Sequence, residues 1–124
     1  MKVLLSIKPE FAFKIFDGSK KFEFRKNIFK RKDIRNVIVY ASSPVQRVIG
    51  EFEIKDILHD DTEKVWDMTK LASGITKQFY DEYFADREKA FAIQIGTIKK
   101  YSSPKSLSDY QLNFAPQSFV YVEL

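Results

Sequence analysis

The sequence predicts a small α+β domain in which a mixed, partly closed β-barrel is flanked by three helices. First, 124 residues suit one hydrophobic core, so a single domain over residues 1–124 is expected. Second, short strand patterns follow one another with few helices between them, which argues against a doubly wound parallel sheet. Third, twelve Phe and six Tyr supply enough apolar surface for a core without metal or disulfides.

The N-terminal part is predicted to form a strand, a helix and a second strand. Lys2–Ile7 is an apolar run, which indicates a strand buried on both faces. In the helix that follows, Pro9 suits the first position because its missing N–H needs no helical partner, and Gly18 suits the left-handed closing position. In Lys20–Lys26 apolar and charged residues alternate, as in a strand with one buried and one polar face.

Four further strands are predicted. After a basic loop, Asn36–Ala41 is a short apolar strand that ends at the turn signal Ser42-Ser43-Pro44. Arg47–Leu58 is a longer strand, and strands return near the end of the chain at Ala90–Tyr101 and Gln117–Leu124.

Two helices are predicted between Leu58 and Ala90, where the apolar period changes. Asp61 or Thr62 caps the first, whose apolar positions include Met68 and Leu71. Thr76 caps the second, whose apolar face is aromatic. Such a face belongs to the core more often than to a groove for a partner.

The composition excludes several kinds of site. There is no cysteine, so disulfides and thiolate zinc sites are impossible. His59 is the only histidine, which excludes a histidine metal cluster and favours a surface or capping role for this residue. The four glycines are isolated, so no phosphate loop is present. No apolar run approaches the roughly 20 residues of a membrane span. We therefore expect a cytoplasmic protein with no cofactor and no membrane partner, and the sequence does not indicate its oligomeric state.

The charges are unevenly distributed along the chain. Residues 19–35 contain eight Lys or Arg and two acidic residues, whereas residues 51–89 contain eleven Asp or Glu and six Lys or Arg. A basic face and an acidic face would orient the protein on a polyanion. An ordinary solvated loop would show the same pattern.

A site for a polar ligand is predicted in the early β-α-β unit. The helix that opens at Pro9, beside Lys8, would attract a phosphate or carboxylate with its free N–H groups. Glu23 can accept hydrogen bonds from a base, and Arg25 on the same strand face can stack on a base or bind phosphate. The alternative is a Glu–Arg pair on a solvated sheet face. The candidate residues are Ser6, Lys8, Lys20, Glu23, Arg25, Lys26, Tyr40, Ser42 and Ser43.

Three runs carry a recognisable pattern: SIKPEFAFKIFDGSKKFEFRK, VIVYASSPVQRVIGEFEI and the ending APQSFVYVEL. The first joins a helix running into Gly-x-Lys to a strand with Glu-x-Arg. In these runs the chain resembles the ASCH domain of the PUA-like superfamily. The resemblance implies a small β-barrel with a cleft for RNA or modified-base recognition. It implies that this cleft is lined by Gly18, Lys20, Glu23 and Arg25 and is reached by Tyr40, Ser42 and Ser43. We add Gln117 and Ser118, because an amide and a hydroxyl there can read the edge of a base.

The resemblance is compatible with two functions, a binding module and an enzyme. We expect a nucleic-acid-binding module that recognises RNA or a nucleoside in translation or transcription control, with DNA as a second ligand class. The alternative is a metal-independent hydrolase of RNA or a modified nucleoside that uses Lys20 and Glu23. Similar proteins that deacetylate acetylcytidine use a Lys, a Thr and a Glu. Lys20 matches the first, but Glu23 stands at the Thr position and Leu71–Ser73 lacks the carboxylate. A third reading is a protein-interaction module that uses the aromatic helix.

Overall fold

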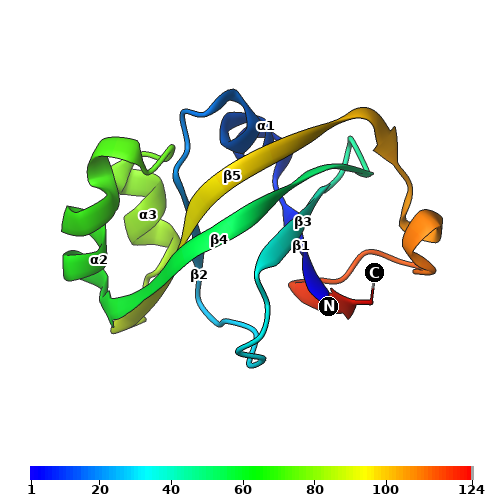
Figure 1. The fold of residues 1–124 in the computed structure, drawn as a ribbon. Helices are drawn as coiled ribbons and strands as arrows, with labels where there is room; N and C mark the ends of the chain where they lie inside the picture. The colour runs from blue at the N-terminus through cyan, green and yellow to red at the C-terminus, as the bar shows by residue number, and fades with distance from the viewer. Residues whose placement is uncertain (124) are drawn as a thin grey trace.

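One six-stranded sheet organises the fold, with the strand order β2-β5-β4-β3-β1-β6 (Figure 1). The structure is a computed structural model and describes residues 1–123. The strands are β1 (Lys2–Ile7), β2 (Phe22–Arg25), β3 (Asn36–Ala41), β4 (Arg47–Asp61), β5 (Lys89–Lys105) and β6 (Phe119–Val122). The helices are α1 (Pro9–Asp17), α2 (Thr62–Thr69) and α3 (Lys77–Tyr83), with 3-10 helices η1 (Lys70–Ala72) and η2 (Leu107–Tyr110). The predicted α+β class with three α-helices is confirmed.

Strands β1 and β3 are buried on both faces, which the apolar run of Lys2–Ile7 predicted for β1. They pair in parallel, whereas the other strand pairs are antiparallel, so the sheet is mixed. Val3 and Leu5 point into the core under α1, while Leu4 points to the opposite face. The last part of β5, η2 and β6 cover that opposite face with Tyr101, Tyr110 and their neighbours.

Helix α1 packs closely on the sheet. Particular residues fix its two ends, and small and apolar residues form its contact with the sheet. Pro9 is at the start of the helix, and Gly18 ends it in the left-handed conformation with φ 87°. Ile15 is fully buried, and the ring of Phe16 lies over Gly50. A Cβ at Gly50 would lie 2.7 Å from that ring, so the glycine permits the close approach.

The connection between β4 and α2 differs from the prediction. Strand β4 continues to Asp61, so His59 lies within the strand and stacks on Phe91 of β5 with ring centroids 3.9 Å apart. Asp61 precedes α2, but its carboxylate accepts from Lys89 Nζ at 2.7 Å and caps no amide of the helix. The competing cation explains the missing cap.

Helix α2 is also shorter than predicted, because it ends at Thr69 and gives way to η1. Met68, within α2, is 58% exposed and Leu71, within η1, is 99% exposed, so neither packs on the core as predicted. Helix α3 begins as predicted: the Thr76 hydroxyl accepts from Phe79 N at 3.0 Å.

The sheet does not close into a barrel in the described part of the chain. Strands β2 and β6 lie at its two edges and are not neighbours in the sheet. Side chains bridge these edges instead. Arg25 of β2 donates to the Ser118 hydroxyl, just before β6, at 2.8 Å. The hydroxyl of Tyr121 in β6 accepts from the amides of Lys30 and Arg31, which follow β2. The predicted partly closed barrel is therefore an open sheet whose edges are joined by side chains.

The two ends of the described chain lie side by side (Figure 1). Strand β1 pairs antiparallel with β6, and Lys2 lies opposite Val122. The predicted last strand covers Phe119–Val122, and Leu124 lies outside the described residues. None of the helices within residues 1–123 is both long and apolar enough to cross a membrane.

Candidate functional site

A cavity of about 460 Å³ lies where the two sheet edges approach each other. Its walls are the end of β1 with the start of α1, strand β2, helix α3, and the segment before β6. The cavity brings together eight of the twelve predicted site residues: Ser6, Lys8, Lys20, Glu23, Arg25, Lys26, Gln117 and Ser118.

The other four predicted residues do not line this cavity. Tyr40 is 4% exposed and packs with Leu4 and Tyr110 in a separate core cluster. Ser42 and Ser43 lie in the turn after β3. None of these three residues lines the cavity, and their part in binding stays a prediction. Gly18 ends α1 outside the cavity, and its part in binding stays a prediction.

Lys20 places a buried cation in the cavity wall. The residue is 1% exposed, and its Nζ donates to the carbonyl oxygen of Ser73 at 2.7 Å. The same Nζ lies 4.8 Å from the ring centroid of Phe24 and 5.3 Å from that of Phe11. Burial lowers the pKa of Lys20 to about 8, although the negative charge of Glu23 opposes this effect. The ammonium group is therefore mostly charged at neutral pH and close to its titration range.

Gly74 makes room for the side chain of Lys20. It has φ +71°, and a Cβ there would lie 2.5 Å from Cγ of Lys20. Gly18 provides a matched comparison, since it has φ +87° but its Cβ would meet nothing closer than Lys21 Nζ at 3.9 Å.

We expect Gly74→Ala to destabilise the domain more than Gly18→Ala. Both alanines adopt a left-handed backbone conformation, which costs roughly 1–2 kcal/mol. Only Gly74→Ala also displaces the buried Lys20 side chain. Gly74→Ala should therefore lower the free energy of unfolding by at least about 1 kcal/mol more than Gly18→Ala does. Urea denaturation of the two variants measures the difference, and equal losses would contradict the role assigned to Gly74.

Glu23 and Arg25 form a buried ion pair that organises the wall. Arg25 Nη1 lies 3.3 Å from Glu23 Oε2, and the exposed fractions of the two side chains are 12% and 8%. Nη1 also donates to the Ser6 carbonyl, and Nη2 donates to both the carbonyl and the hydroxyl oxygen of Ser118. These bonds use the hydrogens of both terminal nitrogens. Arg25 is therefore held by protein acceptors, while Glu23 Oε1 makes no hydrogen bond with the described residues.

An aromatic wall on α3, which the sequence did not predict as part of the site, faces this ionic group. Phe79 and Tyr83 line the cavity one helical turn apart, with ring planes 12° apart and centroids 6.3 Å apart. Burial raises the pKa of Tyr83, so its hydroxyl stays protonated at neutral pH. No sequence signal separated these two rings from the core, because aromatic residues at 79, 80, 83 and 84 span an arc no wider than an ordinary core-facing stripe. Tyr80 and Phe84 do enter the core.

Two lysines flank the aromatic wall. Lys8 Nζ lies 5.2 Å from the ring centroid of Phe79, and Lys26 Nζ lies 4.8 Å from that of Tyr83. Both lysines are exposed and therefore free to meet an anion. The amides at the start of α1 contribute less than predicted, because Pro9 has none and those of Phe11 and Ala12 donate to the Lys8 carbonyl. No cluster of three potential metal-ligating His, Cys, Asp or Glu residues exists within residues 1–123.

Comparison with known proteins finds three informative relatives. The ATP synthase subunit alpha of Ureaplasma parvum is 31% identical over 98% of this chain, which corresponds to 15% of that protein. The large ribosomal subunit protein uL22 of the same species is 32% identical over 98% of this chain and 39% of that protein. An ASCH domain-containing ribonuclease of Zymomonas mobilis is 33% identical over 73% of this chain and 62% of that protein. The chain thus spans less than two thirds of the length of each relative.

Solved structures match the fold over nearly the whole chain. The crystal structure of ASCH from Zymomonas mobilis has a TM-score of 0.90 at 29% identity, and the match covers 98% of this chain and 87% of that one. The N-terminal domain of Staphylothermus marinus McrB has a TM-score of 0.52 at 15% identity, covers 89% of this chain and 78% of that one, and shares the fold alone. The ASCH domain model matches residues 5–99, which is well over half of the chain. The chain therefore belongs to the ASCH domain family.

Proposed function

We propose that the cavity binds one nucleotide of an RNA strand, with the base against α3 and its polar edge toward Lys20 and Glu23. One observation carries the proposal. A buried cation and a buried carboxylate face an aromatic wall inside a single cavity. Its volume of about 460 Å³ lies in the range of roughly 300–1,000 Å³ that is usual for small-ligand sites.

The chemistry of the walls matches the parts of a nucleotide. The free Oε1 of Glu23 can accept hydrogen bonds from the amino or imino groups of a base. The ammonium of Lys20 can donate to a base carbonyl or a phosphate oxygen. The rings of Phe79 and Tyr83 offer faces on which a base can stack, and Lys8 and Lys26 stand beside them to meet phosphates.

The choice of RNA among nucleotide ligands is supported by one of the relatives. The Zymomonas mobilis protein that is 33% identical to this chain is named a ribonuclease. Sequence-selective proteins commonly recognise RNA through unstacked bases that insert into pockets of this kind.

Removing either wall aromatic is expected to weaken binding of a short single-stranded RNA. Base stacking on an aromatic side chain contributes about 1–3 kcal/mol, so Phe79→Ala or Tyr83→Ala should reduce affinity roughly 5- to 150-fold. Fluorescence anisotropy with labelled RNA measures the effect. Phe13→Ala is the matched control, because Phe13 is a 48% exposed aromatic on α1 that does not line the cavity. Affinity that is unchanged in both wall variants would contradict the proposal.

A second candidate function is metal-independent cleavage of the bound RNA. It is favoured by the burial of Lys20, with its pKa of about 8, in the same cavity as Glu23. In this cleavage the 2′-oxygen bonds to phosphorus while the bond from phosphorus to the 5′-oxygen breaks. Glu23 can take the 2′-OH proton and return it to the leaving 5′-oxygen, and Lys20 can stabilise the negative charge on the phosphate. RNA incubated with the protein in a chelating buffer should then yield a product that is absent with Glu23→Gln. If RNA binds but no product forms, cleavage is ruled out and only the binding function stands.

A further inference from the structure

We propose that the RNA strand leaves the cavity over the basic loop, defined as residues 26–35, and that unpaired cations of this loop bind its phosphates. This inference rests on the proposed function and adds the path of the strand beyond the bound nucleotide. It implies that the ligand is a strand of several nucleotides rather than a free nucleoside.

The basic loop begins in the cavity and is fixed beside it. Lys26 and Asn27 line the cavity. Further along, the ring of Phe29 packs on that of Phe119 with centroids 6.2 Å apart. The amides of Lys30 and Arg31 donate to the Tyr121 hydroxyl at 3.0 and 3.1 Å. The loop is therefore held on the β6 side of the site.

The loop offers cations that the protein itself does not neutralise. Its one acidic residue, Asp33, is engaged by Arg31 through two hydrogen bonds of 2.7 and 2.9 Å. The hydrogen bond from Arg31 lowers the pKa of Asp33 to about 2, so this pair stays ionised at neutral pH. Lys30, Lys32 and Arg35 are exposed and form no ion pair with the described residues. Three free charges so close together suit a polyanion.

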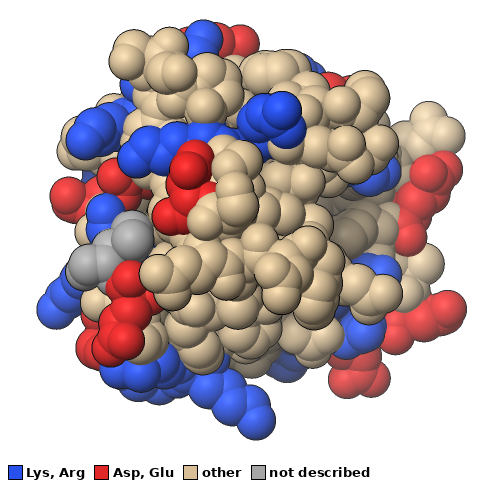
Figure 2. All heavy atoms as spheres, turned by 90° about the vertical axis from the view of Figure 1, so that its right-hand side faces the viewer, with Lys and Arg blue, Asp and Glu red and all other residues tan. Residues whose placement is uncertain are grey.

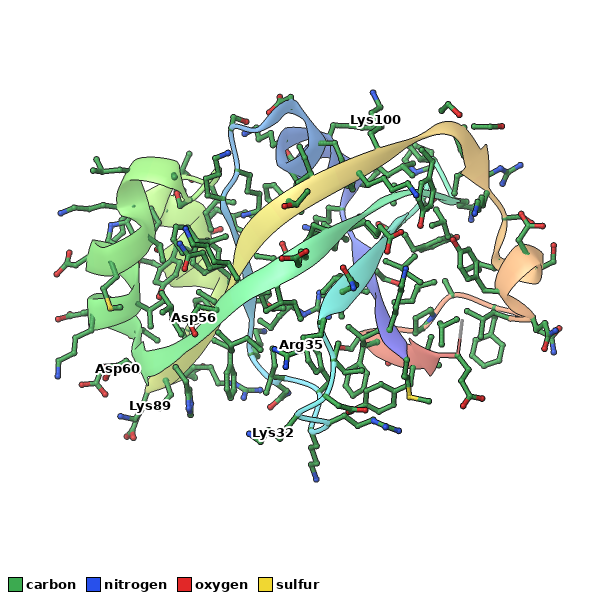
Figure 3. All side chains as sticks on the ribbon, viewed as in Figure 1. Lys32, Arg35, Asp56, Asp60, Lys89 and Lys100 are labelled. Atoms are coloured by element: carbon green, nitrogen blue, oxygen red, sulfur yellow. The ribbon has the colours of Figure 1, made fainter. Side chains whose placement is uncertain are left out.

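Other directions out of the cavity are less favourable for phosphates. Helices α2 and α3 offer fewer free cations, because Lys70 pairs with Asp67 and Lys77 pairs with Asp81, and the exposed Glu82 adds a negative charge. The end of the molecule opposite these helices carries a broad uncharged surface, with most charges around its margin (Figure 2). Lys32 and Arg35 lie on the lower side of the molecule in Figure 3, whereas Lys100 lies at the top. The charge distribution therefore favours the basic loop.

The test compares two double variants that remove the same charge from opposite sides of the molecule. Lys32→Ala with Arg35→Ala alters the basic loop. Lys99→Ala with Lys100→Ala alters exposed lysines of β5 that form no ion pair within residues 1–123. Binding of a ten-nucleotide RNA and of the four nucleoside monophosphates is measured between 50 and 300 mM salt.

The loop variant should bind the ten-nucleotide RNA more weakly than the parent. The slope of log affinity against log salt concentration should become shallower by roughly 1.4, because each phosphate neutralised on a single strand contributes about 0.7 and two cations are removed. The affinity of the loop variant for monophosphates should not change, and the β5 variant should keep the slope of the parent. If both variants lose the same affinity for the RNA, or if the loop variant loses none, the proposed path of the strand is wrong. Binding of a monophosphate by the parent would still support the proposed function in that case. A parent that binds neither ligand would overturn both.

Discussion

Arg25→Ala is expected to lower the free energy of unfolding by about 3–5 kcal/mol, because removing one partner of a buried ion pair leaves the other charge unpaired. The carboxylate that remains is Glu23, which is 6% exposed. The substitution also removes the guanidinium that bridges the two sheet edges through Ser6 and Ser118. Urea denaturation at pH 7 measures the loss.

Two further variants show whether burial is the cause. Arg31 and Asp33 form a pair with the same spacing along the chain, but on the surface. Arg31→Ala should therefore change stability little. Glu23→Gln combined with Arg25→Met replaces both charges by neutral groups of similar size and should recover much of the loss. A change of less than about 1 kcal/mol in Arg25→Ala would show that the bridge contributes little to the fold.

Lys20→Met should weaken nucleotide binding roughly 10- to 100-fold at pH 7 while the domain remains folded. Methionine keeps a long apolar stem between Phe11 and Phe24 and removes the ammonium group. A hydrogen bond from a charged donor contributes about 1.5–3 kcal/mol, which corresponds to the expected loss. Anisotropy with labelled RNA measures the affinity. Lys100→Met is a suitable control, since Lys100 is exposed and does not line the cavity.

The same residue should give the protein a pH dependence of known sign. The pKa of Lys20 is lowered from 10.5 to about 8 by burial, so the unfolded chain binds more protons than the folded protein between these pH values. The free energy of unfolding of the parent should therefore rise by up to about 3 kcal/mol relative to Lys20→Met as the pH increases from 8 to 10.5. Affinity for an anionic ligand should fall over the same window, because the cation is lost. A difference between parent and variant that does not change with pH would contradict the buried position of the charge.

Local patterns in the sequence predicted the helices and strands well at positions where one residue type strongly prefers a particular backbone conformation or cap. Pro9 and Gly18 marked the ends of α1, and the Thr76 cap marked the start of α3. The apolar run of β1 correctly indicated burial on both faces. The end of α2 was missed because its apolar positions Met68 and Leu71 are exposed in the fold.

The candidate site was only half predictable, because its two walls are far apart in the sequence. The ionic residues lie together in β2 and just before it, so their grouping was visible. The carbonyl of Ser73 meets Lys20 across 53 residues, and the aromatic wall of α3 joins the same cavity, only through tertiary packing. Tyr40 does not line the cavity, because its side chain packs with Leu4 and Tyr110 in a separate core cluster that depends on distant parts of the chain.

The antiparallel pairing of β1 with β6 has a consequence for how this domain is accommodated in longer polypeptides. Lys2 lies opposite Val122, so a chain that enters and leaves the domain does so at neighbouring points on one side of the fold. A module with adjoining entry and exit can be spliced into a host loop, or attached at either end, with little disturbance of the host. This geometry fits relatives as different as an ATP synthase subunit and a ribosomal protein, in which the matching segment makes up 15% and 39% of the length.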